Sequence, residues 1–173
     1  TFVNKVPVQI ESGLEKLQSI TDIIKDFGYK PGTVWVDISE RKPTKDMVEK
    51  LELEKGEKVV TFTRIRKASD IHAVYCIDTV KKSDLNIKVE EEIEKESFFD
   101  FFQSECGIDI EYAVADIIPV QPVKEMVDNM DISGEEFFLL LNQIHYDKEG
   151  IPRIYSKDYF NTEVFKFKVN RFK

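Results

Sequence analysis

The chain has 173 residues, of which 42% are hydrophobic and 34% are charged, so it can form one globular domain whose core needs neither disulfides nor metal. Its net charge of −8 argues against direct contact of this segment with a nucleic acid, because such contacts are made mainly by Lys and Arg. The apolar stretches are too short to cross a bilayer and the N-terminus lacks the basic and apolar regions of a secretory signal, so we expect a cytoplasmic protein without membrane contact.

A helix is the first element that the sequence predicts. Ser12 and Glu15 have the spacing of a capping box, in which the two side chains accept hydrogen bonds from free amides at a helix start. Apolar residues then recur at helical spacing from Leu14 to Phe27. Gly28 follows directly, so we expect the helix to end there.

Strands and a short helix complete the first half of the chain. Alternation over residues 33–42 predicts a strand with Val34, Val36 and Ile38 on one face. A short capped helix is expected after Pro43. Two further strands are expected over residues 59–67 and 71–80.

The second half has a similar composition of elements. The polar segment 81–96 carries a run of glutamates and is expected to be a solvated connection or a short helix, and Ser97 then caps a helix that ends near Gly107. The remaining elements are expected to be a strand over 108–120, a helix over 123–130 and strands over 135–146, 151–160 and 164–172. Because strands dominate and are mostly joined as hairpins, we expect an α+β fold, a largely antiparallel sheet with the helices on one side.

One sequence pattern occurs twice. Residues 43–60 and 122–138 share proline, lysine, acidic, methionine, valine and glycine positions in the same order, and the second copy is one residue shorter before its glycine. Each copy predicts a short helix, a glycine turn and two strands joined by a polar turn. The chain is therefore expected to be an internal pseudo-repeat, with two related units that share one sheet and a cleft between the halves.

Sequence motifs of catalysis and metal binding are absent. There is no Gly-rich phosphate loop, no nucleophile elbow and no zinc-protease motif. Cys76 and Cys106 lack the close spacing of a metal or redox pair, and two histidines cannot by themselves build a zinc site. We therefore expect no enzyme activity, no metal and no cofactor.

Two arginines form the one constellation that could carry function. Arg64 and Arg66 are two residues apart on a predicted strand and so share a face. Guanidinium groups bind carboxylate or phosphate through paired hydrogen bonds, and the helix start at Ser97 offers further donors, so together they could form an anion subsite. The alternative is that both arginines cover a solvent-facing strand or pair with surface glutamates.

Four motifs occur in an order and spacing that cover nearly the whole chain. They are Gly13-Leu14-Glu15-Lys16-Leu17-Gln18-Ser19-Ile20-Thr21, then Gly28-Tyr29-Lys30-Pro31-Gly32, then Leu53-x-x-Gly56-Glu57-x-Val59 with Arg64-Ile65-Arg66, then Tyr146-Asp147-x-x-Gly150-Ile151-Pro152 with Tyr155-Ser156 and Tyr159-Phe160. This series resembles the UTRA effector-binding domain of GntR-type bacterial transcription regulators, in their HutC-like branch. Thr1-Phe2-Val3 also resembles the last strand of the winged helix that precedes this domain, so residues 1–10 are expected to be a remnant of wing and linker and 11–173 the effector-binding domain.

The resemblance implies a chorismate lyase-like fold that binds a small anionic metabolite and forms a homodimer. DNA would then be contacted only through the N-terminal winged helix that this chain lacks, and the metabolite would change DNA binding. By resemblance, the ligand's acidic group is held by Arg64, Arg66 and Ser97, and the pocket is lined by Ile20, Thr21, Phe99 and Phe160.

Two positions depart from the family pattern. Sugar-phosphate-sensing members often carry glutamates where this chain has Cys76 and Ile154. Since an unpaired buried polar group costs roughly 1 to 3 kcal/mol, this exchange favours a less polar ligand body toward Cys76, Ile154 and Phe160. The alternative is that Cys76 and Ile154 are ordinary core residues, and His145 is expected to be a half-buried sheet residue.

Two other functions remain open at this stage. A chorismate lyase-like enzyme acting on an aromatic or dicarboxylic acid would share the fold and could use the arginine pair. The wing remnant argues against it, as does the lack of any convincing buried acid near the cleft. A dimerisation module with a vestigial pocket is the third possibility, and it would have a cleft filled by side chains.

Overall fold

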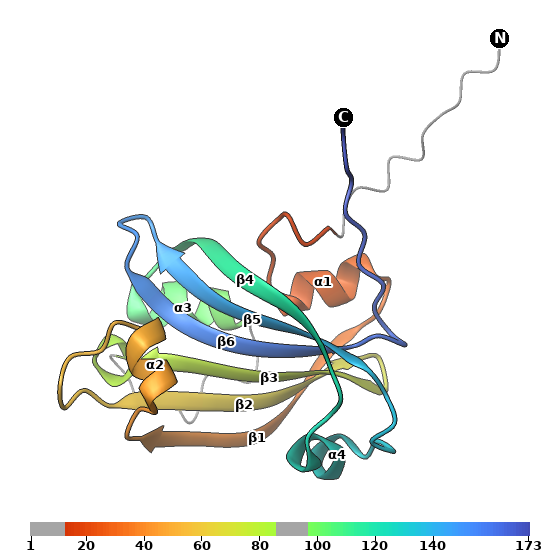
Figure 1. The fold of residues 1–173 in the computed structure, drawn as a ribbon, viewed down its shortest axis with the longest axis horizontal. Coiled ribbons are helices and arrows are strands. Elements are labelled where there is room, and N and C mark those ends of the chain that lie inside the picture. The colour runs from red at the N-terminus through yellow and green to blue at the C-terminus, as the bar shows by residue number, and fades with distance from the viewer. Residues whose placement is uncertain (1–12, 86–96) are drawn as a thin grey trace.

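Six antiparallel strands form one sheet in the computed structural model, which describes residues 13–85 and 97–173 (Figure 1). The strands are β1 (Pro31–Arg41), β2 (Val59–Ala68), β3 (Ile71–Lys81), β4 (Ile110–Val120), β5 (Phe138–Asp147) and β6 (Pro152–Asn161). The helices are α1 (Ile20–Asp26), α2 (Lys45–Lys50), α3 (Phe98–Cys106), α4 (Lys124–Met130) and the 3-10 turn η1 (Lys82–Asp84). The predicted α+β class and antiparallel sheet are confirmed. Ser12, the proposed wing remnant and most of the glutamate-rich segment lie outside the described residues.

The internal repeat is confirmed by the order of the strands. The sheet runs β1-β2-β3-β6-β5-β4, so each half of the chain supplies three neighbouring strands and the halves meet at β3 and β6. Each half also places a short helix, α2 or α4, between its first and second strands. Across the junction Cys76 pairs with Asp158 and Asp78 pairs with Ser156. A pseudo-twofold axis between β3 and β6 therefore relates Asp78 to Asp158 and Cys76 to Ser156.

Helices cover both faces of the sheet, so the expectation of helices on one side is wrong. Helices α1 and α3 pack on one face, where apolar clusters form around Ile24 and Phe160 and around Phe102 and Phe62. Helices α2 and α4 pack on the opposite face (Figure 1). The physical reason is that the central strands are apolar on both sides: every residue of β2 except Lys67 is buried. Of the described residues, no helix is long and apolar enough to cross a membrane.

The first strand does not alternate as predicted. A bulge between Trp35 and Asp37 shifts the register of β1 against β2 by one residue. Ile38 consequently packs with the α3 cluster, whereas Val36 packs with the α4 cluster on the opposite face. After a bulge, successive side chains point to the opposite faces from those expected by simple alternation. The sequence does not reveal this change where residues on both faces are apolar.

Three element ends also differ from the prediction. The first helix begins at Ile20, because the side chain of Ser19 accepts the amide of Asp22 as N-cap. Residues 164–172 form no strand, because the alternating aromatic side chains there pack in a cluster of rings instead. The ring centres of Phe165 and Phe27 lie 5.1 Å apart. Strand β5 begins at Phe138 and not at residue 135 as predicted, and the preceding Phe137 is exposed.

Candidate functional site

A cavity of about 410 Å³ lies between the sheet and the two helices α1 and α3. Its walls come from both repeat units: β2 and β3 of the first unit, and β4, β5 and β6 of the second. The chain before α1 and the first residues of α3 complete the wall. The cavity therefore lies over the junction of the two halves, and a size of this order is typical of sites for small molecules.

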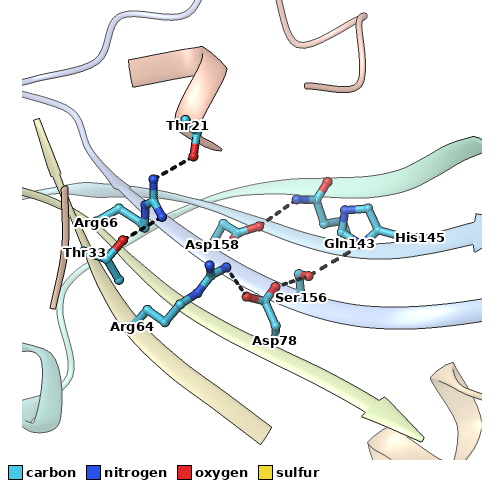
Figure 2. A network of polar contacts seen from close by, with 9 residues as sticks. All are labelled: Thr21, Thr33, Arg64, Arg66, Asp78, Gln143, His145, Ser156 and Asp158. Carbon is cyan, nitrogen blue, oxygen red and sulfur yellow. Dashed lines mark hydrogen bonds and ion pairs between the residues drawn. The ribbon is translucent and has the colours of Figure 1, made fainter. Parts of the chain in front are cut away.

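An arginine and an aspartate form a closed ion pair on the cavity floor (Figure 2). Arg64 is 3% exposed, and its Nη2 donates to Oδ2 of Asp78 at 2.6 Å. The Ser156 hydroxyl donates to the other oxygen, Oδ1, at 2.6 Å. The Arg64 guanidinium also lies over the Phe98 ring, 4.8 Å from its centre. Burial lowers the pKa of Arg64, but the Asp78 carboxylate and other negative groups together outweigh burial, so that the pKa of Arg64 is raised and its guanidinium stays charged.

The second arginine is buried and hydrogen-bonds to no carboxylate in residues 13–85 and 97–173. Arg66 is 4% exposed, and its Nη1 and Nη2 donate to the hydroxyls of Thr33 at 2.8 Å and Thr21 at 2.7 Å. Its Nε has no hydrogen-bond partner among residues 13–85 and 97–173. Burial and the neighbouring charge of Arg64 lower the pKa of Arg66. Among the residues that the structure describes, the hydrogen-bond partners of the Arg66 charge are thus neutral hydroxyls (Figure 2).

A second aspartate lies opposite, equally buried. Asp158 is 3% exposed and accepts a hydrogen bond from the Gln143 amide at 2.8 Å on Oδ2, whereas Oδ1 has no hydrogen-bond partner within the described part of the chain. Burial and, after it, the Asp78 carboxylate raise the pKa of Asp158 to about 7, although the amide of Gln143, the charge of Arg64 and the Cys76 thiol act against this rise. A group with this pKa changes its charge near neutral pH.

His145 lies beside this network and is fully buried, not half-buried as expected. Its Nδ1 lies 3.5 Å from the Ser156 hydroxyl, and its ring meets Phe99 edge to face at 5.1 Å. Burial lowers the pKa of His145 to about 4, so its imidazole is neutral at pH 7. His145 therefore offers the cavity a neutral polar group and no positive charge.

The structure brings most of the residues expected from the resemblance to one cavity wall. The residues that line it are Arg64, Arg66, Ser97, Ile20, Thr21, Phe99 and Phe160. Cys76 and Ile154 do not line it: Cys76 is buried beneath the polar network in the α1 cluster, and Ile154 is buried in the α3 cluster. These two positions thus follow the alternative of ordinary core residues.

One sequence inference is overturned, since buried acids do occur in the cleft. Asp78 and Asp158 both line the cavity, and sequence reasoning missed them together with Gln143, His145 and Ser156. The signal was present in the alternation of the strands, because an acidic side chain two positions from an inward apolar residue faces the same way. Asp78 stands two residues after Cys76, and Asp158 two before Phe160.

The cavity shows no arrangement for a metal. Among the residues that the structure describes, no group of three or more His, Cys, Asp or Glu side chains is placed to hold a metal ion. Of the two histidines, His72 lies outside the cavity with its Nδ1 2.9 Å from the carbonyl of Met130, and His145 lies in its wall beside the Ser156 hydroxyl. The polar groups in the cavity are thus suited to hydrogen bonds and ion pairs with an organic ligand.

Comparisons with known proteins give a family and a fold. The profile of the UTRA domain matches residues 26–166. A GntR-family transcriptional regulator from Enterococcus faecalis V583 superposes with a TM-score of 0.71 at 23% identity, over 81% of this chain and 100% of that chain. PhnF from Mycobacterium smegmatis gives 0.82 at 17% identity, over 91% of this chain and 70% of that chain. A possible transcriptional regulator, YydK from Bacillus subtilis, gives 0.76 at 20% identity, over 92% and 66%. No curated protein matches the chain.

Proposed function

Since the profile covers most of its length, the chain belongs to the UTRA domain family, and we propose that it is the metabolite-sensing domain of a bacterial transcription regulator. In this proposal a small anionic metabolite binds in the cavity and changes the DNA binding of a winged helix that precedes this segment. The structures it resembles are effector domains of GntR-family regulators, and that likeness supports the shared fold. The domain itself would supply coupling and no chemistry.

The observation that carries the proposal is the burial of the Arg66 guanidinium with hydroxyl groups as its hydrogen-bond partners in the described residues. A buried guanidinium that has only hydroxyl partners is costly, because transfer of a charge from water is compensated poorly by neutral groups. An anionic ligand group would supply the missing countercharge. The Nε atom, which has no partner in the described residues, offers one more donor for such a group.

The helix α3 supplies a second wall to the proposed anion subsite. Ser97 caps this helix by accepting the amide of Asp100 at 3.1 Å, and it lines the same cavity as the arginines. A serine that accepts through its oxygen keeps its hydroxyl proton for another acceptor. We therefore assign Ser97 to the ligand's anionic group together with Arg66, while Arg64 remains with Asp78.

We also propose a homodimer whose arrangement responds to the ligand. The edge strand β4 exposes Val114, Ile117 and Ile118, and its outer backbone has no partner strand in the described part of the sheet. Open apolar edges favour pairing with a second chain. Since Ala113, Ala115 and Ile117 of the same strand line the cavity, a ligand could bias that pairing only through its different affinity for two arrangements.

Titration calorimetry with a panel of phosphorylated and carboxylated metabolites tests the anion subsite. We expect the wild-type chain to bind at least one of them and Arg66→Met to bind it at least tenfold more weakly. Arg41→Met is the matched control, because it removes the same charge from an exposed position of β1. Equal affinity of Arg66→Met and the wild type would refute the role of Arg66.

Two further measurements separate this function from its alternatives. Small-angle scattering with and without a saturating ligand tests the dimer, and identical profiles would count against a ligand-dependent arrangement. Turnover of chorismate or a similar acid by the purified chain would favour the lyase-like enzyme. The buried Asp78 and Asp158 remove one argument against that enzyme, whereas the UTRA profile favours a regulator.

A further inference from the structure

The charges on the cavity floor do not balance locally. Arg64 and Asp78 neutralise each other in direct contact. Arg66 is a cation with hydroxyl partners, and Asp158 is an acid with an amide partner. No ion pair joins Arg66 to Asp158 within the described part of the chain, where the hydrogen-bond partners of Arg66 are hydroxyls and that of Asp158 is an amide. The cavity thus presents two groups of opposite sign, each of which lacks an ion-pair partner in direct contact among the residues that the structure describes (Figure 2).

The pseudo-twofold axis shows what is missing at Asp158. Arg64 pairs with Cys76 across β2 and β3, and Gln143 pairs with Ser156 across β5 and β6, so Arg64 and Gln143 are equivalent positions. In the first unit the donor to the buried carboxylate is a guanidinium, at 2.6 Å. In the second unit the equivalent donor to Asp158 is a neutral amide, at 2.8 Å. The second carboxylate therefore lacks the cation that the first one has.

We infer that the effector is a small zwitterion whose ammonium group binds Asp158 while its anionic group binds Arg66. This inference rests on the proposed sensing function and names the ligand class. The ammonium would approach Oδ1, the oxygen without a partner in the described residues, while Gln143 holds Oδ2 and fixes the orientation of the carboxylate. Charge-assisted hydrogen bonds of this kind are about twice as strong as neutral ones.

A purely anionic ligand suits this cavity less well. It would bring a third negative group beside Asp78 and Asp158, and like charges in a buried site favour the uptake of a proton by one of the carboxyls. A neutral hydroxyl could donate to Oδ1 but would leave the charge of Asp158 unanswered. An ammonium group supplies both the donor and the charge. The charges of Arg64, Arg66, Asp78 and Asp158 then sum to zero, as do the charges of the ligand.

Matched probes of one length test the inference by titration calorimetry at pH 7.5. The first set is 2-aminoethylphosphonate, 2-hydroxyethylphosphonate and ethylphosphonate; the second is 4-aminobutyrate, 4-hydroxybutyrate and butyrate. We expect the amino member of at least one set to bind at least tenfold more tightly than its deamino partner. In Asp158→Asn this preference should disappear, while binding of the deamino anion stays the same or strengthens.

The outcomes separate the inference from the function on which it rests. Anions that bind through Arg66 without preference for the amino member overturn the zwitterion and leave the anion sensor standing. If no probe binds at concentrations up to about 10 mM, both the zwitterion inference and the anion sensor are overturned for these ligand classes. An amino preference that persists in Asp158→Asn also overturns the assignment to Asp158.

Proton exchange gives a second readout that needs no variant. Titrations at pH 6.5 in two buffers of different ionisation enthalpy measure protons released or taken up on binding. Asp158 is faced by Asp78, Arg64, Cys76 and Gln143, and a bound ammonium would add a positive charge that favours its ionised form. With the carboxylate set, whose members do not titrate near this pH, we expect 4-aminobutyrate to release protons and butyrate to take them up. Proton uptake with 4-aminobutyrate would overturn the inference.

Discussion

The buried acid Asp158 should leave a signature in the stability of the ligand-free domain. Its pKa is raised from 3.8 to about 7, chiefly by burial, which corresponds to about 4 kcal/mol of differential free energy. Between these two pH values the folded state holds a proton that the unfolded state has released. The folded state therefore loses stability as the pH rises from about 4 to 7.

His145 acts in the opposite direction over nearly the same range. Burial lowers its pKa from 6.5 to about 4, so that below pH 6.5 the unfolded chain binds a proton that the folded one refuses. Stability consequently rises with pH between about 4 and 6.5, by about 3 kcal/mol. The two groups nearly cancel, and we expect them to add little net slope to the wild-type stability.

Single variants should reveal the two hidden slopes. In Asp158→Asn the free energy of unfolding, measured by urea denaturation from pH 4.5 to 8, should rise with pH relative to the wild type by several kcal/mol. In His145→Gln it should fall with pH relative to the wild type. Asp116→Asn is the control, because it makes the same chemical change at an exposed position of β4. Parallel profiles of Asp158→Asn and the wild type would refute the reasoning.

Three further predictions concern single side chains, each measured by urea denaturation at pH 7. Arg64→Met should lose about 3 to 5 kcal/mol because Asp78 is left charged and buried, and the double variant with Asp78→Asn should lose less; a larger loss in the double variant would contradict the ion pair. Phe102→Ala should lose about 3 to 5 kcal/mol since its ring is fully buried, and a loss under 1 kcal/mol would contradict that packing. Gly107→Ala should lose about 1 kcal/mol because this residue ends α3 at a φ of 66°, and a gain in stability would contradict that geometry.

The sequence predicts the architecture better than the site, for a physical reason. Repetition and period-two alternation are long patterns, so an error of three residues at the start of β5 or an unseen bulge at Trp35 leaves the strand order intact. The sequence does not predict which face of the sheet each helix covers. Strands that are apolar on both sides carry no record of which helix covers which side, so α2 and α4 could not be assigned from the sequence.

The site depends on single inward positions, where the sequence gives little warning. Arg64 and Arg66 stand out because two cations on one strand face are unusual in a core. Asp78 and Asp158 are less conspicuous, since they belong to a chain rich in acids whose ordinary place is the surface. Their burial is indicated by the strand alternation alone, in which Asp78 is in phase with Cys76 and Asp158 with Phe160, and this alternation holds only where no bulge intervenes.

The duplication explains why the site has a direction. Two identical units around an axis would give a symmetric floor with two equal ion pairs, and a ligand could bind it in two equivalent orientations. Here the position that Arg64 occupies in one unit is occupied by Gln143 in the other, so the two carboxylates differ in their partners. The difference of one charged group against one amide makes Asp158 and Asp78 unequal. If this asymmetry orients the ligand, Gln143→Arg should complete the second ion pair and abolish the preference for amino probes, whereas a preference that persists would show that orientation is set elsewhere.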